Sequence, residues 1–195
     1  MSKAARTKEY IIEKIAPVFN TKGYAGTSMT DLTEATGLTK GSIYGNFANK
    51  DEVAVAAFEY NLDKVENILR SEIAKENTIK DKLLVYAKVY DNILKDPFPY
   101  GGCPVLNTAV EADDTHPLLK AKASAAIIRW KNNIVRMIEK GVERKEFRKN
   151  VNAEQTALTM IAMIEGAIMI TKLTGKSNFR KQVLQSLADL IEELT

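Results

Sequence analysis

The stretch that decides the fold is residues 27–50, which reads TSMTDLTEATGLTKGSIYGNFANK. Ser28 or Thr30 can cap a first short helix, and Gly37 allows a sharp turn after it. Thr39 can cap a second short helix that follows directly. Two short helices joined by a tight glycine turn are an arrangement that lays a helix in the major groove of DNA.

The second of these helices is apolar on one side only. Successive helical residues rotate by about 100°, so Ile43 and Phe47, four residues apart, point together toward the core. The opposite side carries Gly41, Ser42 and Gly45. These residues are small enough for the helix backbone to come close to base edges.

Polar residues around this face suit two kinds of DNA contact. Ser42 and Asn46 can exchange hydrogen bonds with base edges. Lys40 and Lys50 can neutralise phosphates, as can backbone N–H groups at the starts of the helices. The alternative is a plain helical corner whose polar face is simply solvated.

The distribution of charge supports a polyanion-binding segment at the start of the chain. The protein has 195 residues and a net charge of +3. Residues 1–50 carry seven Lys or Arg and four Asp or Glu, whereas residues 51–195 carry 21 of each sign. We therefore expect a small DNA-binding domain at residues 1–50 and a larger, neutral body at residues 51–195.

Helical spacing of apolar residues extends over nearly the whole chain, and no window alternates for long with the period of a strand. Ile12, Ile15, Ala16 and Phe19 form the first such stripe. Pro17 lies inside it and costs about 3 kcal/mol there, so we expect a kink or a locally opened turn. The predicted fold is all-α, with nine helices at about residues 4–21, 29–35, 40–46, 50–73, 78–95, 104–112, 118–144, 153–173 and 179–194.

The last two expected helices bear on assembly. The ninth has a one-sided apolar stripe, whereas the eighth is apolar nearly all round and must be covered on more than one face. A second copy would cover it by forming a four-helix homodimer interface through helices eight and nine. The alternative is a helix wholly buried in the monomer. We favour the dimer, because paired half-sites on DNA require a two-fold axis.

Four motifs stand in order over residues 7–54: KGY at the end of the first helix, then TSMTDL, ATGLTKGSIYGNF and NKDE. In order and spacing they closely resemble the DNA-binding segment of TetR-family transcriptional regulators. The resemblance implies a dimer, usually a repressor, that binds a palindromic operator in double-stranded DNA and is released by a small-molecule inducer held in the body. By matched position, the resemblance implies DNA contacts at Thr27, Ser28, Thr39, Lys40, Ser42, Tyr44, Asn46 and Lys50. Gly41, on the outward face of the second short helix, completes the expected set.

Two positions depart from the common pattern of that family. Gly45 and Asn46 follow Tyr44 where the family often has a second aromatic residue and a histidine. We therefore expect a different set of phosphate contacts and a different sequence preference. In the body, residues 101–107 and Glu111 resemble one subgroup with a Gly-Cys motif before the sixth helix, which implies a shared architecture.

Aromatic and methionine side chains of the body are candidates for an apolar ligand pocket among the fifth to eighth helices. They can equally belong to the core. Asn107, Glu111 and Glu165 can supply the few polar groups that such a pocket needs, although Glu165 can instead pair across a dimer. The expected ligand contacts are Tyr86, Tyr90, Cys103, Asn107, Glu111, Trp130 and Met163.

Cys103 has two interpretations. It can be a small buried residue at a helix start, or a reactive thiol, because a helix N-terminus favours the thiolate and Gly101 and Gly102 would leave it accessible. In the second case, oxidation or alkylation of Cys103 would release DNA. His116, the only histidine, precedes a proline and is expected in a turn. One His and one Cys do not build a transition-metal site, so we expect no metal and no cofactor.

Other classes of protein fit the sequence less well. The polar N-terminus does not resemble a signal peptide, and the longest apolar run, Met160–Ile170, has 11 residues and contains Glu165, so we expect no membrane span. A single cysteine excludes an intrachain disulfide and favours the cytoplasm. An enzyme needs a clustered nucleophile, base and orienting group, which the composition hardly provides. A helical scaffold has no reason to concentrate its surplus charge in residues 1–50.

Overall fold

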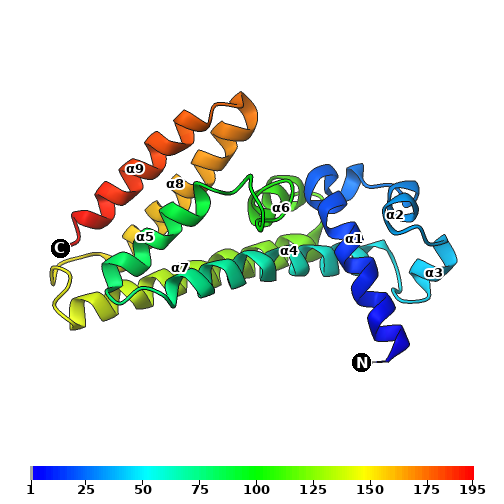
Figure 1. Ribbon diagram of the computed structural model, residues 1–195, viewed down its shortest axis with the longest axis horizontal. Coiled ribbons are helices and arrows are strands. Elements are labelled where there is room, and N and C mark those ends of the chain that lie inside the picture. Colours follow the sequence, from blue (N-terminus) through cyan, green and yellow to red (C-terminus); the bar gives the residue numbers. More distant parts are fainter. Residues whose placement is uncertain (1) are drawn as a thin grey trace. The chain divides into compact units, whose positions relative to one another are not determined.

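A computed structural model describes residues 2–195, and every regular element in that range is a helix (Figure 1). The helices are α1 (Lys3–Gly26), α2 (Met29–Thr36), α3 (Lys40–Tyr44), α4 (Lys50–Ile73), α5 (Ile79–Tyr90), α6 (Pro104–Ala112), α7 (Pro117–Glu143), α8 (Ala153–Thr174) and α9 (Ser177–Glu192). The prediction of an all-α fold with nine helices is confirmed for this range.

By packing, the chain forms two compact units. The first comprises Met1–Val65 and Phe98–Ala125, and the second comprises Glu66–Pro97 and Ala126–Thr195. The first unit therefore holds α1 to α3, α6 and the beginnings of α4 and α7. The functional boundary that we predict at residue 50 is a different division of the chain and remains a prediction.

Side-chain caps fix the starts of most helices, as the sequence indicates. Ser28, not Thr30, caps α2, and Thr39 caps α3 by accepting the Ser42 N–H. Gly37 ends α2 with φ +68°, in the left-handed region where glycine is favoured. Thr78 caps α5 and Asn152 caps α8 in the same way.

The first helix is interrupted at Gly23 and not at Pro17, which corrects our expectation. Gly23 has φ +71° and ψ −177°, which are not helical angles, so the helix is broken there before it continues to Gly26. A proline removes a single backbone hydrogen bond. At Pro17 the helix is held by its buried neighbours Ile15, Ala16 and Phe19, and the backbone stays helical.

Two helices are shorter than predicted. α3 ends at Tyr44, because the Asn46 side chain folds back and its Nδ2 donates to the Ser42 carbonyl at 2.9 Å. α5 ends at Tyr90, although Ile93 continues the apolar stripe and is buried. The Ile93 N–H donates to the Tyr90 carbonyl at 3.3 Å, so the chain tightens into turns before Pro97.

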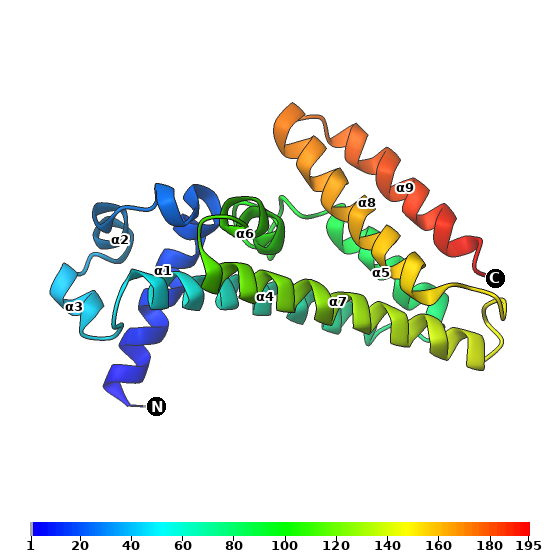
Figure 2. The ribbon, with the colours of Figure 1, turned by 180° about the vertical axis from the view of Figure 1, so that it is seen from behind.

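The core of the second unit lies where α8 packs along α9, with α5 against both (Figure 2). Met160, Ile164 and Ala167 of α8 are fully buried, as are Leu187 and Ile191 of α9. By length and composition α8 alone among the helices of residues 2–195 is apolar enough to cross a membrane. Its buried face against α9 is that of a core helix.

Candidate nucleic-acid interface

The helix-turn-helix, which consists of α2, the turn at Gly37 and α3, is held in the first unit by buried apolar side chains. Ile43 of α3 and Leu32 of α2 are completely buried, and Phe47 is 2% exposed. Ile11 and Ile15 of α1 are also completely buried, and α1 packs along α2. The inner side of α3 is therefore fixed as predicted, so its other side faces away from the core.

The outward side of α3 is open and nearly bare. Thr39, Lys40 and Gly41 are exposed, whereas Ser42 and Tyr44 are half-buried. A Cβ added at Gly41 would come no closer than 4.0 Å to any neighbouring atom, at Thr39 Oγ1. The fold thus has room for a side chain at Gly41, yet glycine costs a helix about 1 kcal/mol relative to alanine. Packing within the chain therefore does not explain the glycine at this position.

Besides the helix caps Ser28 and Thr39, three of the predicted DNA-contact residues have side chains that are hydrogen-bonded within the chain. Thr27 is 1% exposed and its hydroxyl donates to the Gly23 carbonyl at 2.5 Å. Thr27 therefore does not face solvent, and we remove it from the expected contacts. The Asn46 amide is held by α3 as described above, and Lys50 Nζ donates to the Tyr24 carbonyl at 2.7 Å.

The start of α2 carries its own counter-charge. Ser28 and Asp31 form a capping box in which the Asp31 carboxylate accepts from the Ser28 N–H at 2.8 Å. Lys22 Nζ lies 2.5 Å from the same carboxylate. The hydrogen bond from Lys22, with smaller contributions from the Ser28 N–H and hydroxyl, lowers the pKa of Asp31 to about 2. Because the carboxylate stays ionised at neutral pH, it partly offsets the attraction of this helix end for phosphate.

Tyr24, just after the break in α1, is the junction of four helices of the first unit. Its hydroxyl donates to Asp51 Oδ1 at 2.5 Å, and the Lys50 ammonium lies 4.4 Å from the centre of its ring. The His116 ring packs edge-on against it at 4.3 Å between centroids. The hydrogen bond to Asp51 raises the pKa of Tyr24 to about 12, and the same bond, with smaller contributions from His116 and Lys50, lowers the pKa of Asp51.

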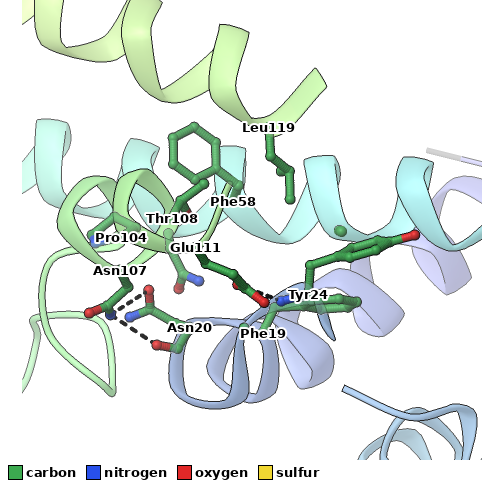
Figure 3. Close-up of a pocket in the computed structure, with 12 residues that line it drawn as sticks. Phe19, Asn20, Tyr24, Phe58, Pro104, Asn107, Thr108, Glu111 and Leu119 are labelled. Atoms are coloured by element: carbon green, nitrogen blue, oxygen red, sulfur yellow. Dashed lines mark hydrogen bonds between the residues drawn. The ribbon is translucent and has the colours of Figure 1, made fainter. Parts of the chain in front are cut away.

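Glu111 of α6 completes this junction (Figure 3). Its carboxylate accepts the Tyr24 N–H and the Ala25 N–H, each at 2.8 Å. A Cβ at Gly23 would overlap that carboxylate, so the glycine is needed both for its backbone conformation and for the approach of Glu111. The adjoining cavity of about 20 Å³ has room for about one water molecule and is too small for an organic ligand.

The predicted ligand residues fall into two groups that belong to different units. In the second unit, Trp130 stacks on Tyr86 and on Tyr90, at 6.2 and 5.5 Å between ring centroids. Burial raises the pKa of Tyr86, whose ring is almost fully enclosed. Met163 of α8 is half-buried in the same unit.

The remaining predicted ligand residues lie in the first unit, where they serve the fold. Asn107 Nδ2 donates to the carbonyls of Asn20 and Gly101, at 2.9 and 3.1 Å, and so ties α6 to α1. Glu111 binds the end of α1 as described above. Cys103 is 1% exposed at the start of α6, which agrees with the first of its two interpretations, and its thiol is not accessible as the second requires. Over residues 2–195, no three His, Cys, Asp or Glu side chains are grouped as metal ligands.

Sequence reasoning missed the junction at Tyr24. The KGY motif indicated a helix end at Gly23, but nothing in its spacing pointed to residues 87 positions away in α6. His116 was expected in an ordinary turn, whereas it is 8% exposed and contacts Tyr24 and Asp51. The available signal in the sequence was that this single histidine directly precedes a proline, where a residue that caps a helix can stand.

We predict that Gly23→Ala lowers the free energy of unfolding by about 1–3 kcal/mol, because the left-handed conformation strains alanine and the Cβ meets the Glu111 carboxylate. In a Glu111→Ala background the overlap is gone and only the strain remains, so the same substitution should cost less. Urea unfolding of the four proteins of this double-mutant cycle measures the difference. Equal costs in both backgrounds would show that Glu111 does not press on Gly23.

Comparison with known proteins places these features in a family. Residues 11–57 match the model of bacterial regulatory proteins of the tetR family, and residues 80–187 match the tetracyclin repressor-like C-terminal domain. A TetR-family regulator from Cytophaga hutchinsonii is 52% identical, with a TM-score of 0.96 over 100% of this chain and 97% of that one.

Two further relatives agree. A TetR regulator from Chloroflexus aurantiacus is 36% identical, with a TM-score of 0.94 over 99% of this chain and 98% of that one. The transcriptional regulator TtgR of Pseudomonas putida is 24% identical over 85% of this chain and 80% of its own length. These relatives are DNA-binding regulators and not enzymes. The chain belongs to the TetR family of transcriptional regulators.

Proposed function

We propose that this protein is a homodimeric repressor that binds a palindromic operator and is released from it by a small-molecule inducer. The outward side of α3 supports the first part most directly. It is exposed, carries Lys40, and holds a glycine for which the chain itself has no packing requirement. A cytoplasmic location and a functional boundary near residue 50 belong to this proposal.

In the proposed complex α3 enters the major groove. Ser42 and Tyr44 then lie beside Gly41 along the bases, and the exposed Lys40 and Thr39 meet the phosphates at the groove edge. Ser28, which caps α2, then contacts the DNA backbone near the start of that helix. Lys50 reaches a phosphate only by leaving the Tyr24 carbonyl, and Asn46 reaches a base only by leaving Ser42.

The dimer is proposed to form through α8 and α9. One face of α8 stays exposed in the single chain and is apolar at intervals of three or four residues: Leu158, Ala162, Gly166, Met169 and Leu173. Met169 is 48% exposed and Leu173 is 80% exposed. A Cβ at Gly166 would meet nothing within 4 Å, although glycine weakens a helix interior. Close approach of a second α8 accounts for both observations.

The inducer is proposed to bind in the body and to act on the DNA-binding segment by a population shift. It must prefer a conformation in which the two α3 helices no longer match the groove repeat. The Glu111 clamp supports a route for that signal, because it joins α6 to the end of α1 through two backbone hydrogen bonds. The stacked Tyr86, Trp130 and Tyr90 are the proposed aromatic contacts of the inducer.

We predict that Lys40→Glu combined with Ser42→Glu abolishes duplex binding, because two carboxylates would face the phosphates. Gly41→Leu should weaken binding at least about tenfold while leaving stability equal or higher, since leucine is a better helix former. Lys120→Glu with Ser124→Glu makes the same charge change on α7 and is the control. Fluorescence anisotropy with selected duplexes and thermal melting measure the two properties. Binding of the α3 variants at the control's affinity would refute the proposed DNA-binding surface.

For the dimer, we predict that Met169→Glu combined with Leu173→Glu converts the protein to a monomer, because burying unpaired carboxylates in an apolar interface is costly. Leu94→Glu changes an exposed leucine elsewhere in the second unit and should leave the dimer intact. Light scattering measures the mass. A dimer that survives the α8 substitutions would place the interface elsewhere.

Trp130 is the only tryptophan, so its fluorescence reports on the proposed inducer contacts. We predict that compounds of a panel of aromatic small molecules that quench Trp130 also weaken operator binding. By linkage, the loss of operator affinity at saturation must equal the ratio of the compound's affinities for free and operator-bound protein. Quenching compounds that bind both forms equally would contradict release by an inducer at this place.

A further inference from the structure

His116 does two things at the start of α7. Its Nδ1 accepts the Leu119 N–H at 3.2 Å, which makes it the N-cap of the helix. Its Nε2 lies 3.4 Å from Asp51 Oδ1 at the start of α4. The ring also packs against Tyr24 at the end of α1. One nearly buried side chain thus touches three helices of the first unit.

Only one protonation state meets both polar contacts. Nδ1 must keep its lone pair to accept from Leu119, and Nε2 must carry the proton that faces the Asp51 carboxylate. Neutral imidazole does this with the proton on Nε2. In the charged form both ring nitrogens are donors, so Nδ1–H would face the Leu119 N–H.

The charged groups around His116 come from every helix packed on it. α4 provides the Asp51 carboxylate and the Lys50 ammonium, α1 provides the Tyr24 hydroxyl, and α6 provides Glu111, which is turned to the Tyr24 and Ala25 N–H groups. α7 itself presents the positive end of its dipole at this point.

Protonation of His116 therefore has opposed effects. It strengthens the attraction to Asp51, whose side chain is 47% exposed and so is well screened by water. It also removes the cap of α7, leaves a nearly buried N–H without its acceptor and adds a cation at the positive helix end. The lost cap bond and the unpaired N–H lie in the shielded part of the site, where water does not replace them.

We propose that His116 is a positioning residue that stabilises the Tyr24 junction, where α1 meets α4, in its neutral form and destabilises it when protonated. The consequence for operator binding rests on the proposed function. The junction is held while His116 is neutral and is lost when acidification protonates the ring. Acidification then becomes a second input to the DNA-binding segment, independent of an inducer.

The test compares the wild-type protein with His116→Asn and His116→Ser at pH 7.5 and pH 5.5 and constant ionic strength. Asparagine and serine cap helices well and do not titrate, so they keep the Leu119 bond without the switch. Two variants guard against a folding defect in one of them. The measurements are hydrogen exchange of the amides of residues 24–27 and 50–54, corrected for intrinsic rates, and affinity for a selected duplex.

We expect the wild-type protein to lose amide protection and about fivefold in affinity at pH 5.5 relative to the two variants, the size of one lost helix cap. Parallel exchange profiles in all three proteins would overturn the proposal. If the exchange of the wild-type protein differs from that of the variants but all three affinities change equally with pH, the link to DNA binding is overturned. If none of the proteins binds a duplex at either pH, the proposed function fails, and the exchange profiles still decide the role of His116.

Discussion

The arrangement of the first unit depends on how the end of α1 is held at Tyr24. The break at Gly23 turns two backbone N–H groups toward α6, where the Glu111 carboxylate accepts both. The Tyr24 hydroxyl and carbonyl are taken by Asp51 and Lys50 of α4. Since α4 begins a few residues after α3, these bonds fix where the outward face of the helix-turn-helix points. A movement of α6 would be felt at the end of α1 through the Glu111 bonds and through Asn107, which also ties α6 to α1.

Much of this fold could be predicted from local chemistry. Ser28, Gly37 and Thr39 marked the helix-turn-helix, because capping and left-handed glycine depend on neighbours within four residues. The Tyr24 junction could not be predicted in this way, since its bonds join residues far apart in the chain. The same limit explains Asn107, a plausible ligand contact by composition that in fact ties α6 to the Asn20 carbonyl. Burial of Cys103 likewise follows from tertiary packing and not from the glycines before it.

Three glycines separate what the fold requires from what a partner requires. Gly23 is required internally, by its backbone conformation and by Glu111. Gly41 and Gly166 have open space around them and sit in helices that alanine would stabilise. Gly41 lies on the outward face of α3, and Gly166 lies on the exposed apolar face of α8. Their positions agree with the two surfaces that a dimeric DNA-binding protein must keep clear, one for the duplex and one for its second copy.

The central claim is that two copies of this chain place their α3 helices in successive major grooves. Selection of bound sequences from random duplexes by the purified protein tests it most directly. The account predicts an enriched palindrome whose half-sites lie about 34 Å apart or a multiple of that distance. Enrichment of an asymmetric site, or no enrichment over the starting pool, would contradict it.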